Sequence, residues 1–364
     1  MNRAIRVFHV LPNLSVGGGE KLAIDICSFL DKDSFNCTIV SLYKSQETIY
    51  EQLAKENNIE IIFLDKKKGI DLNVIIQLIS IFKKYKPDII HTHLYVMSYV
   101  LPAAIFCNIK NIIHTVHSVA NKELRKPVRR IMYIAYKVFS VTPVAISSYI
   151  KDTIHKEYRI DNQCIKCIYN GVDTFRFKNK RDIKNKQIIE LIHVGKFRKE
   201  KNHKLLIESF KLVSEEIDNI QLKLVGDGEL RGEIEELVEK LEIKSKVIFR
   251  GIQKDIAQEL KKSDIFVLSS DWEGIPLSVI EAMAAKLPII STKAGGVVDI
   301  VNNNEVGFLV EIGDKKGLAN AIIKLSNDYE MRERFANEAV KQAKKYDIRN
   351  KVKEYEELYK ESFR

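Results

Sequence analysis

Two carboxylates, Glu273 and Glu281, flank a Gly-Ile-Pro sequence and form the stretch of the chain best suited to chemistry. The apolar run 265–268 predicts a buried strand, and 277–285 predicts a helix with Pro276 at its start, where a missing N–H costs nothing. Free N–H groups at a helix start attract phosphate. Carboxylates on the adjoining turns can accept hydrogen bonds from sugar hydroxyls. The stretch therefore predicts a sugar-nucleotide site, and the alternative is an ordinary strand–loop–helix with two surface acids.

A basic loop containing Lys196, Arg198, Lys199 and Lys201 follows the predicted strand 188–194. When a bond to a diphosphate breaks, negative charge develops on the leaving phosphates. Cations at that point stabilise the transition state more than the ground state. The loop therefore predicts a diphosphate site, and the alternative is a solvated basic loop.

Glycine-rich segments also follow predicted strands, where backbone N–H groups can approach a ligand without interference from a Cβ atom. A tight turn is the alternative for each. These segments are 17–19, 226–228 and 295–296.

Three histidines stand at predicted strand ends. His117 follows the strand 112–116 and could hydrogen-bond to sugar hydroxyls. His91 and His93 alternate at the end of the strand that begins at 88 and therefore point to one face. As a metal pair they lack an evident third ligand, so packing or polarity of the acceptor site is favoured for them.

Predicted strands and helices alternate along the whole chain, which is typical of parallel sheets covered by helices on both faces. Two such series predict an α/β fold of two doubly wound, Rossmann-like domains that face a central cleft. Ligands of these folds bind at the carboxyl ends of the strands, where the segments above fall. The expected domains are 1–180 and 181–345, with a polar linker at 178–186 and a final helix at 346–364 that crosses back to the first domain.

Composition sets limits on the protein class. The 364-residue chain is 45% hydrophobic and 30% charged, which indicates a globular protein large enough for two cores. The longest apolar run, 94–107, is shorter than the roughly 20 residues of a membrane span, and the start lacks a signal-peptide pattern. Five cysteines at irregular spacing predict reduced thiols, and we expect a cytoplasmic protein.

The net charge of +10 belongs to the first half of the chain. Residues 1–180 hold 26 Lys and Arg against 16 Asp and Glu, whereas the rest holds 33 of each. The segment 121–137 carries six of these basic residues and predicts a basic amphipathic helix that contacts an anionic membrane surface or a polyanionic acceptor. A solvated basic face is the alternative.

Eight motifs occur in the order and at the spacing typical of the retaining glycosyltransferases of family four, and the chain resembles that family over nearly its full length. The resemblance implies the GT-B architecture, a nucleotide-sugar donor on the second domain and an acceptor on the first. The motifs lie at 17–20, 91–93, 115–117, 170–175, 195–202, 226–228, 273–281 and 295–296.

The resemblance also implies roles for individual residues. Glu273 would contact the donor sugar and Glu281 the nucleotide ribose, with His117 near both substrates. Lys196 and Lys201 would stabilise the leaving diphosphate. The family has arginine where this chain has Lys196, so a compact ammonium replaces a guanidinium that can form two parallel hydrogen bonds. Arg198 is the candidate to share the role of Lys196. The other donor-binding residues implied are Gly17, Gly18, Gly226, Leu230, Ile252, Gly274, Ile275, Pro276 and Leu277.

Asp31-Lys-Asp33 matches the metal-nucleotide signature of the other large glycosyltransferase architecture, but it lies between a predicted helix and the start of a strand. We interpret it as a surface turn and expect no metal and no other cofactor. The function expected is retaining transfer from a nucleotide-sugar, with UDP favoured, to a glycan or lipid-linked acceptor in cell-surface polysaccharide or glycolipid biosynthesis. The alternatives are a sugar-nucleotide epimerase or phosphorylase of the same architecture, or a non-catalytic polyanion-binding protein.

Overall fold

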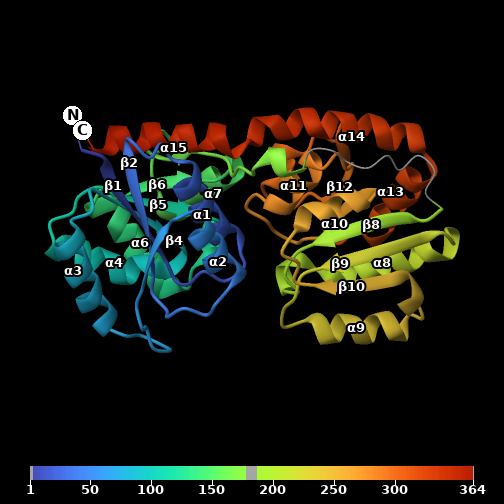
Figure 1. Cartoon of the computed structure of the whole chain (residues 1–364). Coiled ribbons are helices and arrows are strands. Elements are labelled where there is room, and N and C mark those ends of the chain that lie inside the picture. The colour runs from blue at the N-terminus through green and yellow to red at the C-terminus, as the bar shows by residue number, and fades with distance from the viewer. Residues whose placement is uncertain (1–2, 178–186, 364) are drawn as a thin grey trace. The chain divides into compact units, whose positions relative to one another are not determined.

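The computed structural model describes residues 3–177 and 187–363 and divides the chain into two compact units (Figure 1). The first unit contains Met1–Gly171 and Ile348–Arg364, and the second contains Val172–Asp347. The predicted linker 178–186 and the predicted boundary at residue 180 lie outside the described residues.

The first unit is built on a parallel seven-stranded sheet of order β3-β2-β1-β4-β5-β6-β7. Its inner strands β4 and β5 are buried on both faces because helices cover both sides of the sheet. The strands are β1 (Ile5–Leu11), β2 (Phe35–Ser41), β3 (Glu60–Phe63), β4 (Ile89–His93), β5 (Ile112–Val116), β6 (Thr142–Ala145) and β7 (Lys166–Cys167). The helices are α1 (Gly18–Phe29), α2 (Ile49–Glu56), α3 (Asn73–Tyr85), α4 (Met97–Phe106), α5 (Ala120–Glu123), α6 (Lys126–Val138), α7 (Ser148–Tyr158) and α15 (Ile348–Phe363).

The C-terminal helix α15 belongs to the first unit. Its apolar face, with Val352, Tyr355 and Tyr359, is buried in the same core as residues of β1 and α1. Burial of about 25 cal/mol per Å² of apolar surface stabilises this packing. The last residues of the chain are therefore part of the first core.

The second unit contains a parallel six-stranded sheet of order β10-β9-β8-β11-β12-β13. Its strands are β8 (Ile189–Val194), β9 (Ile220–Val225), β10 (Val247–Gly251), β11 (Ile265–Leu268), β12 (Ile289–Thr292) and β13 (Gly307–Val310). Its helices are α8 (His203–Glu216), α9 (Arg231–Lys240), α10 (Ile256–Lys262), α11 (Leu277–Ala284), α12 (Val297–Ile300), α13 (Lys315–Asn327) and α14 (Tyr329–Ala343).

Both sheets have a point at which the strand order reverses. In the first unit this point lies between β1 and β4, and in the second it lies between β8 and β11. The helices that follow the two neighbouring strands leave to opposite faces there, which opens a crevice at the carboxyl ends of the strands. The predicted fold class is confirmed, and it fixes where in each unit a ligand is expected.

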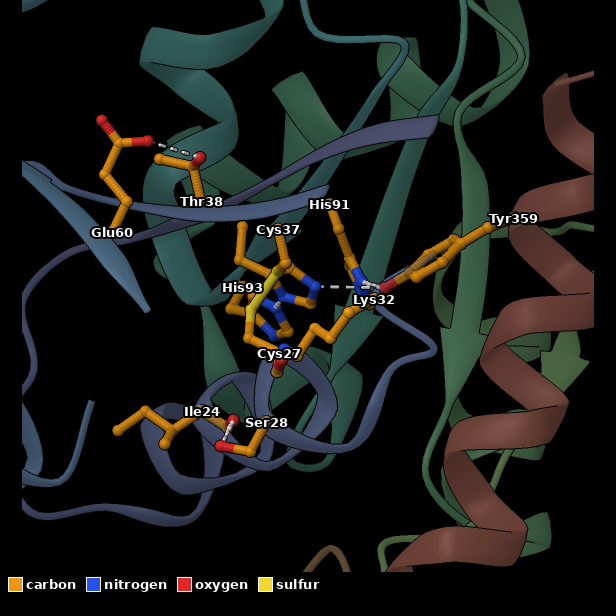
Figure 2. Close-up of a disulfide and its surroundings, with 11 residues drawn as sticks. Ile24, Cys27, Ser28, Lys32, Cys37, Thr38, Glu60, His91, His93 and Tyr359 are labelled. Carbon is orange, nitrogen blue, oxygen red and sulfur yellow. Dashed lines mark hydrogen bonds between the residues drawn. A yellow bond between two sulfur atoms is a disulfide. The ribbon is translucent and has the colours of Figure 1, made fainter. Parts of the chain in front are cut away.

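Two sequence-based expectations are wrong. The basic helix predicted at 121–137 is two helices, α5 and α6, separated by an extended and buried Leu124. Pro127 lies in the first turn of α6, where it is tolerated, whereas inside one long helix its ring would clash with the carbonyl of Glu123. The expectation of reduced thiols fails for Cys27 and Cys37, which the structure pairs as a disulfide (Figure 2).

The remaining cysteines, Cys107, Cys164 and Cys167, form no disulfide within the described residues. The Asp31–Asp33 sequence is an exposed turn between α1 and β2, as predicted, with Asp31 accepting hydrogen bonds from Ser34 and from the Asp33 backbone. No helix in the described parts of the chain has the length and apolar character needed to cross a membrane.

Candidate functional site

In the second unit, the loops after β8 and β11 meet at the reversal of strand order, and a buried ion pair joins them. Lys201 Nζ lies 2.7 Å from Glu273 Oε1, and the Ser270 hydroxyl donates to the same oxygen at 2.6 Å. The Glu273 residue is only 9% exposed. Burying a carboxylate costs free energy unless charged and hydrogen-bonding partners replace the water that it loses. The structure therefore brings together two residues that the sequence placed 72 positions apart.

Further hydrogen bonds hold the two loops in register. Asn202 Nδ2 donates to Asp271 Oδ1 at 2.8 Å, and the Asn202 side-chain oxygen caps α8 by accepting from Leu205 N. The Ser269 hydroxyl donates to the Lys201 carbonyl at 2.9 Å. Asn202 has a φ of 43°, in the left-handed region where asparagine is among the best tolerated residues. Lys201 is consequently held at two points, at its backbone carbonyl by Ser269 and at its ammonium by Glu273.

The glycines after β9 permit a close approach to the loop after β8. A Cβ atom on Gly226 would lie 2.0 Å from the Gly195 carbonyl oxygen, and one on Gly228 would lie 2.6 Å from that of Phe197. Leu230 N donates to the same Phe197 carbonyl at 3.1 Å. This packing is sufficient reason for glycine at both positions, and a ligand contact by Gly226 stays a prediction.

The remaining predicted donor residues follow neighbouring strands of this sheet. Ile252 comes directly after β10 and is 54% exposed. Leu230 is half-buried against the core at the start of α9. Lys196 is half-buried and Arg198 is exposed in the loop after β8. Those around α11 are buried in the entry loop (Gly274, Ile275, Pro276) or half-buried on the helix (Leu277, Glu281).

In the first unit, the glycine loop after β1 and His117 after β5 lie against each other. A Cβ atom on Gly19 would lie 3.2 Å from His117 Nε2 and 3.3 Å from two ring carbons. The loop backbone therefore covers one face of the imidazole ring. Gly17 caps the start of α1, and Gly18 is its first residue.

His117 is the outer member of a cluster of histidines. His93 Nδ1 lies 2.9 Å from His117 Nε2, and His93 Nε2 lies 3.0 Å from His9 Nδ1. His91 lies beside His9 in the register of β4 and β1, and its Nδ1 is 2.7 Å from the Tyr359 hydroxyl. His9, His91 and His93 are fully buried.

His9 is the third imidazole that the sequence interpretation of His91 and His93 lacked. Ring nitrogens of these three residues lie within 4.8 Å of one another, a spacing at which they could ligate a metal ion. The sequence did not indicate a role for His9 or Tyr359, because β1 and α15 are far from β4 in the chain. The signal that existed was a polar residue inside the apolar run 5–11, which is unusual for a buried strand.

Burial keeps the histidines uncharged. It lowers the pKa of His9 to about 3 and that of His117 to about 4. The pKa values of His91 and His93 are also well below the ordinary value, because of burial and of the neighbouring imidazoles. A neutral imidazole can both donate and accept one hydrogen bond, so the cluster suits hydroxyl recognition better than charge stabilisation.

Glu123, which the sequence interpretation did not select, supports His117 from the other side. Its Oε1 accepts the His117 backbone N–H at 3.0 Å. Burial raises the pKa of its carboxyl to about 8 despite this hydrogen bond. The residue comes from α5, so the break between α5 and α6 leaves it close to the end of β5.

Comparisons with known proteins match both halves of the chain. The model described as Glycosyltransferase Family 4 matches residues 16–176, and the one described as Glycosyl transferases group 1 matches residues 173–342. The α-1,3-galactosyltransferase of Escherichia coli that uses UDP-Gal and GlcNAc-diphosphoundecaprenol is 29% identical over 79% of this chain and 79% of its own. The N-acetyl-α-D-glucosaminyl L-malate synthase of Bacillus anthracis is 34% identical over 54% of each chain.

Solved structures match the fold. HepE of Anabaena, in complex with UDP and glucose, superposes with a TM-score of 0.87 at 18% identity, covering 98% of this chain and 100% of HepE. A glycosyltransferase of Rickettsia africae superposes with a TM-score of 0.85 at 21% identity, with full coverage of both chains.

We predict that the buried histidines make the protein acid-labile. Because their folded pKa values lie below 6.5, the unfolded chain binds more protons between pH 6.5 and about 4. The free energy of unfolding should be highest above pH 6.5 and fall below it, by about 1.4 kcal/mol per pH unit for each histidine. Glu123 opposes this slope, since its raised pKa lowers stability as pH rises toward 8.

Urea unfolding at pH 5.0 and 7.5 measures this difference. The Glu123→Gln variant should show a steeper pH dependence than the parent chain, because it removes the opposing contribution of that carboxyl. Equal stability at the two pH values would contradict the neutral, buried state of the cluster.

Proposed function

Since the chain belongs to glycosyltransferase family 4, among the glycosyl transferases of group 1, we propose that it moves a sugar from a UDP-sugar to a glycan or lipid-linked acceptor. The proposed transfer retains the anomeric configuration and needs no metal. The second unit binds the donor, and the first unit binds the acceptor. The proposed setting is cell-surface polysaccharide or glycolipid biosynthesis at the cytoplasmic face of a membrane.

The observation that carries this proposal is the Lys201–Glu273 pair at the reversal point of the second sheet. An ammonium fixed by a carboxylate and by its own backbone is preorganised to meet the charge that develops on a leaving diphosphate. Lys196 and Arg198 stand in the same loop and add positive charge. In the proposed mechanism these cations, and the start of α11, replace the metal ion that other glycosyltransferases use.

The arrangement of Glu273 supports retention without a covalent intermediate. One of its carboxylate oxygens already accepts from Lys201 and Ser270. Such an oxygen is a weak nucleophile, because its charge is stabilised by both donors. We therefore assign Glu273 to hydrogen bonding with the donor sugar. The acceptor attacks from the side of the departing phosphate, which takes up the acceptor proton.

The proposed nucleotide site runs along neighbouring strand ends of the second sheet. Ile252 and Leu230, after β10 and β9, would line the base, and Glu281 on α11 would bind the ribose. HepE of Anabaena, which shares the fold, was solved with UDP and glucose, and the E. coli relative is named for UDP-Gal. These relatives support UDP as the nucleotide.

The surface of α6 supports an acceptor at a membrane. One face of the helix exposes Tyr133, Ile134 and Val138, the last by 66%, beside Lys and Arg side chains. Arg129 does not belong to this face, because it pairs with Glu157 at 2.7 Å. Apolar side chains flanked by cations are typical of helices that lie on anionic lipid. The E. coli relative is named for a diphosphoundecaprenol acceptor.

We predict slow nucleotide release from one donor in a panel of UDP-, GDP- and ADP-sugars. Glu281→Ala removes the proposed ribose contact, a hydrogen bond to a charged group, and should weaken donor binding by roughly ten- to a hundredfold. Absence of release from every donor, together with no thermal stabilisation by free nucleotides, would contradict the assignment and favour polyanion binding.

We predict that Lys201→Met lowers turnover of that donor by roughly a hundredfold or more. It should also destabilise the fold by roughly 3 kcal/mol, because Glu273 loses its cation while buried. The matched control is Lys223→Met, which breaks the Lys223–Glu190 pair between β9 and β8, likewise largely buried but within the sheet. Its stability loss should be similar and its turnover unchanged. Equal turnover losses in both variants would mean that Lys201 acts only through stability.

We predict that the protein floats with vesicles of phosphatidylcholine and phosphatidylglycerol but not with phosphatidylcholine alone. Ile134→Ser combined with Val138→Ser should reduce binding strongly. Ile76→Ser serves as the control, because Ile76 is 65% exposed on α3 of the same unit. Binding that ignores lipid charge, or that falls equally in both variants, would rule out α6 as the membrane contact.

A further inference from the structure

A continuous hydrogen-bonded chain leads from the C-terminal helix to His117. It consists of Tyr359, His9, His93 and His117, which we call the histidine chain. The Tyr359 hydroxyl lies 3.1 Å from His9 Nε2, His9 Nδ1 lies 3.0 Å from His93 Nε2, and His93 Nδ1 lies 2.9 Å from His117 Nε2. The first three members are fully buried, so water does not compete for these bonds.

We propose that the histidine chain fixes which ring nitrogen of His117 carries its proton, and so leaves His117 Nδ1 as a hydrogen-bond acceptor for a substrate hydroxyl. Tyr359, His9 and His93 are thereby positioning residues for His117. The inference rests on the proposed function for its substrate, and on the geometry of the first unit for everything else.

Neutral histidines impose one direction on the whole chain. Each neutral imidazole has one N–H donor and one acceptor nitrogen, so a ring that accepts at one side must donate at the other. Either every ring donates toward His117, or every ring donates away from it. The direction is decided at Tyr359, which has a single hydroxyl hydrogen for its two histidine neighbours.

The distances around Tyr359 select the direction. Its oxygen lies 2.7 Å from His91 Nδ1, ordinary for a hydroxyl donor, and 3.1 Å from His9 Nε2, which is long for a hydroxyl donor but within the range of an N–H donor. Tyr359 therefore donates to His91 and accepts from His9. On its other side, His91 Nε2 donates to the Thr115 hydroxyl oxygen at 2.7 Å.

The direction then propagates to the site. His9 donates its Nε2–H to the Tyr359 oxygen, so its Nδ1 accepts from His93 Nε2–H. His93 Nδ1 in turn accepts from His117 Nε2–H. The proton of His117 is on Nε2, and Nδ1 keeps its lone pair. In the described parts of the chain Nδ1 makes no hydrogen bond, and the Gly19 backbone holds the ring in place from one face.

The surroundings keep the chain from finding other partners. His9 also lies against the Cys27–Cys37 disulfide, whose sulfur atoms are within 4.8 Å of its ring nitrogen and are weak acceptors. Figure 2 shows this disulfide beside His93, with the Tyr359 hydroxyl directed at His91. The ring nitrogens of His9, His91 and His93 all have hydrogen-bond partners, which favours protons over a metal ion in the cluster.

The tautomer can be read directly by NMR on protein labelled with ¹⁵N-histidine, using two-bond ¹H–¹⁵N correlations and His117→Asn to assign the signals. We expect protonated Nε2 and unprotonated Nδ1 for His117 in the parent chain. Tyr359→Phe removes the hydroxyl that orients the chain and should give a mixture of both tautomers. Tyr136→Phe is the control, since it removes a buried tyrosine hydroxyl on α6 that has no hydrogen-bond partner among the described residues.

Thr115→Val is a second variant in case Tyr359→Phe fails to fold. It removes the hydroxyl that accepts from His91 Nε2, and it should also give a mixture of both His117 tautomers. With the donor found by nucleotide release, Tyr359→Phe should lower kcat by roughly three- to tenfold, the size of one hydrogen bond, with KM for the donor little changed. Tyr136→Phe should leave both kcat and KM unchanged.

Three results would overturn the proposal. They are a His117 proton on Nδ1 in the parent chain, an unchanged His117 tautomer in both Tyr359→Phe and Thr115→Val, or one equivalent of Zn²⁺ bound and lost in His93→Gln. The NMR and metal measurements need no donor. Failure to find a donor would therefore count against the proposed function alone.

Discussion

The buried contact between Lys201 and Glu273 is the constraint on which the second unit depends. Glu273 is buried and Lys201 is partly buried, so each charge loses hydration that the contact with the other compensates. The loops that contain these two residues follow the neighbouring strands β8 and β11, where the helices leave to opposite faces of the sheet. The hydrogen bonds of Asn202, Ser269 and Ser270 hold the loops so that the pair forms. The doubly wound topology therefore supplies the place, and the ion pair fixes the geometry of the candidate site within it.

The first unit depends on buried neutral groups and not on a buried ion pair. Its strand ends carry imidazoles that burial keeps uncharged, and His9, His91 and His93 each pair both ring nitrogens with neighbouring side chains. The helix α15, which is distant in sequence, contributes the Tyr359 hydroxyl that completes the set. A C-terminal helix that seemed to be only a packing element is thus tied to the residues nearest the candidate acceptor site.

The sequence predicted what depends on local pattern, and it failed where distant segments meet. Strand 265–268, strand 112–116 and the start of α11 were predicted correctly, because apolar runs and proline placement are local signals. The contact of Lys201 with Glu273 followed only from the fold. The roles of His9 and Tyr359, the Cys27–Cys37 pairing and the support by Glu123 depend on strand order and helix docking. No spacing rule within one segment encodes these contacts.

The two units carry different electrostatics, and the proposed transfer reaction would use both. Residues 181–364 hold equal numbers of acidic and basic residues, yet lysines and Arg198 are concentrated in the loop 196–201 at one strand end. The excess positive charge of residues 1–180 lies in part on the exposed face of α6, while the interior histidines are neutral. An acceptor hydroxyl needs a neutral hydrogen-bond partner that does not hold its proton, whereas a departing diphosphate needs fixed cations. In the proposed reaction the neutral cluster would meet the first need and the lysine loop the second, so burial in one unit and ion pairing in the other would serve its two halves.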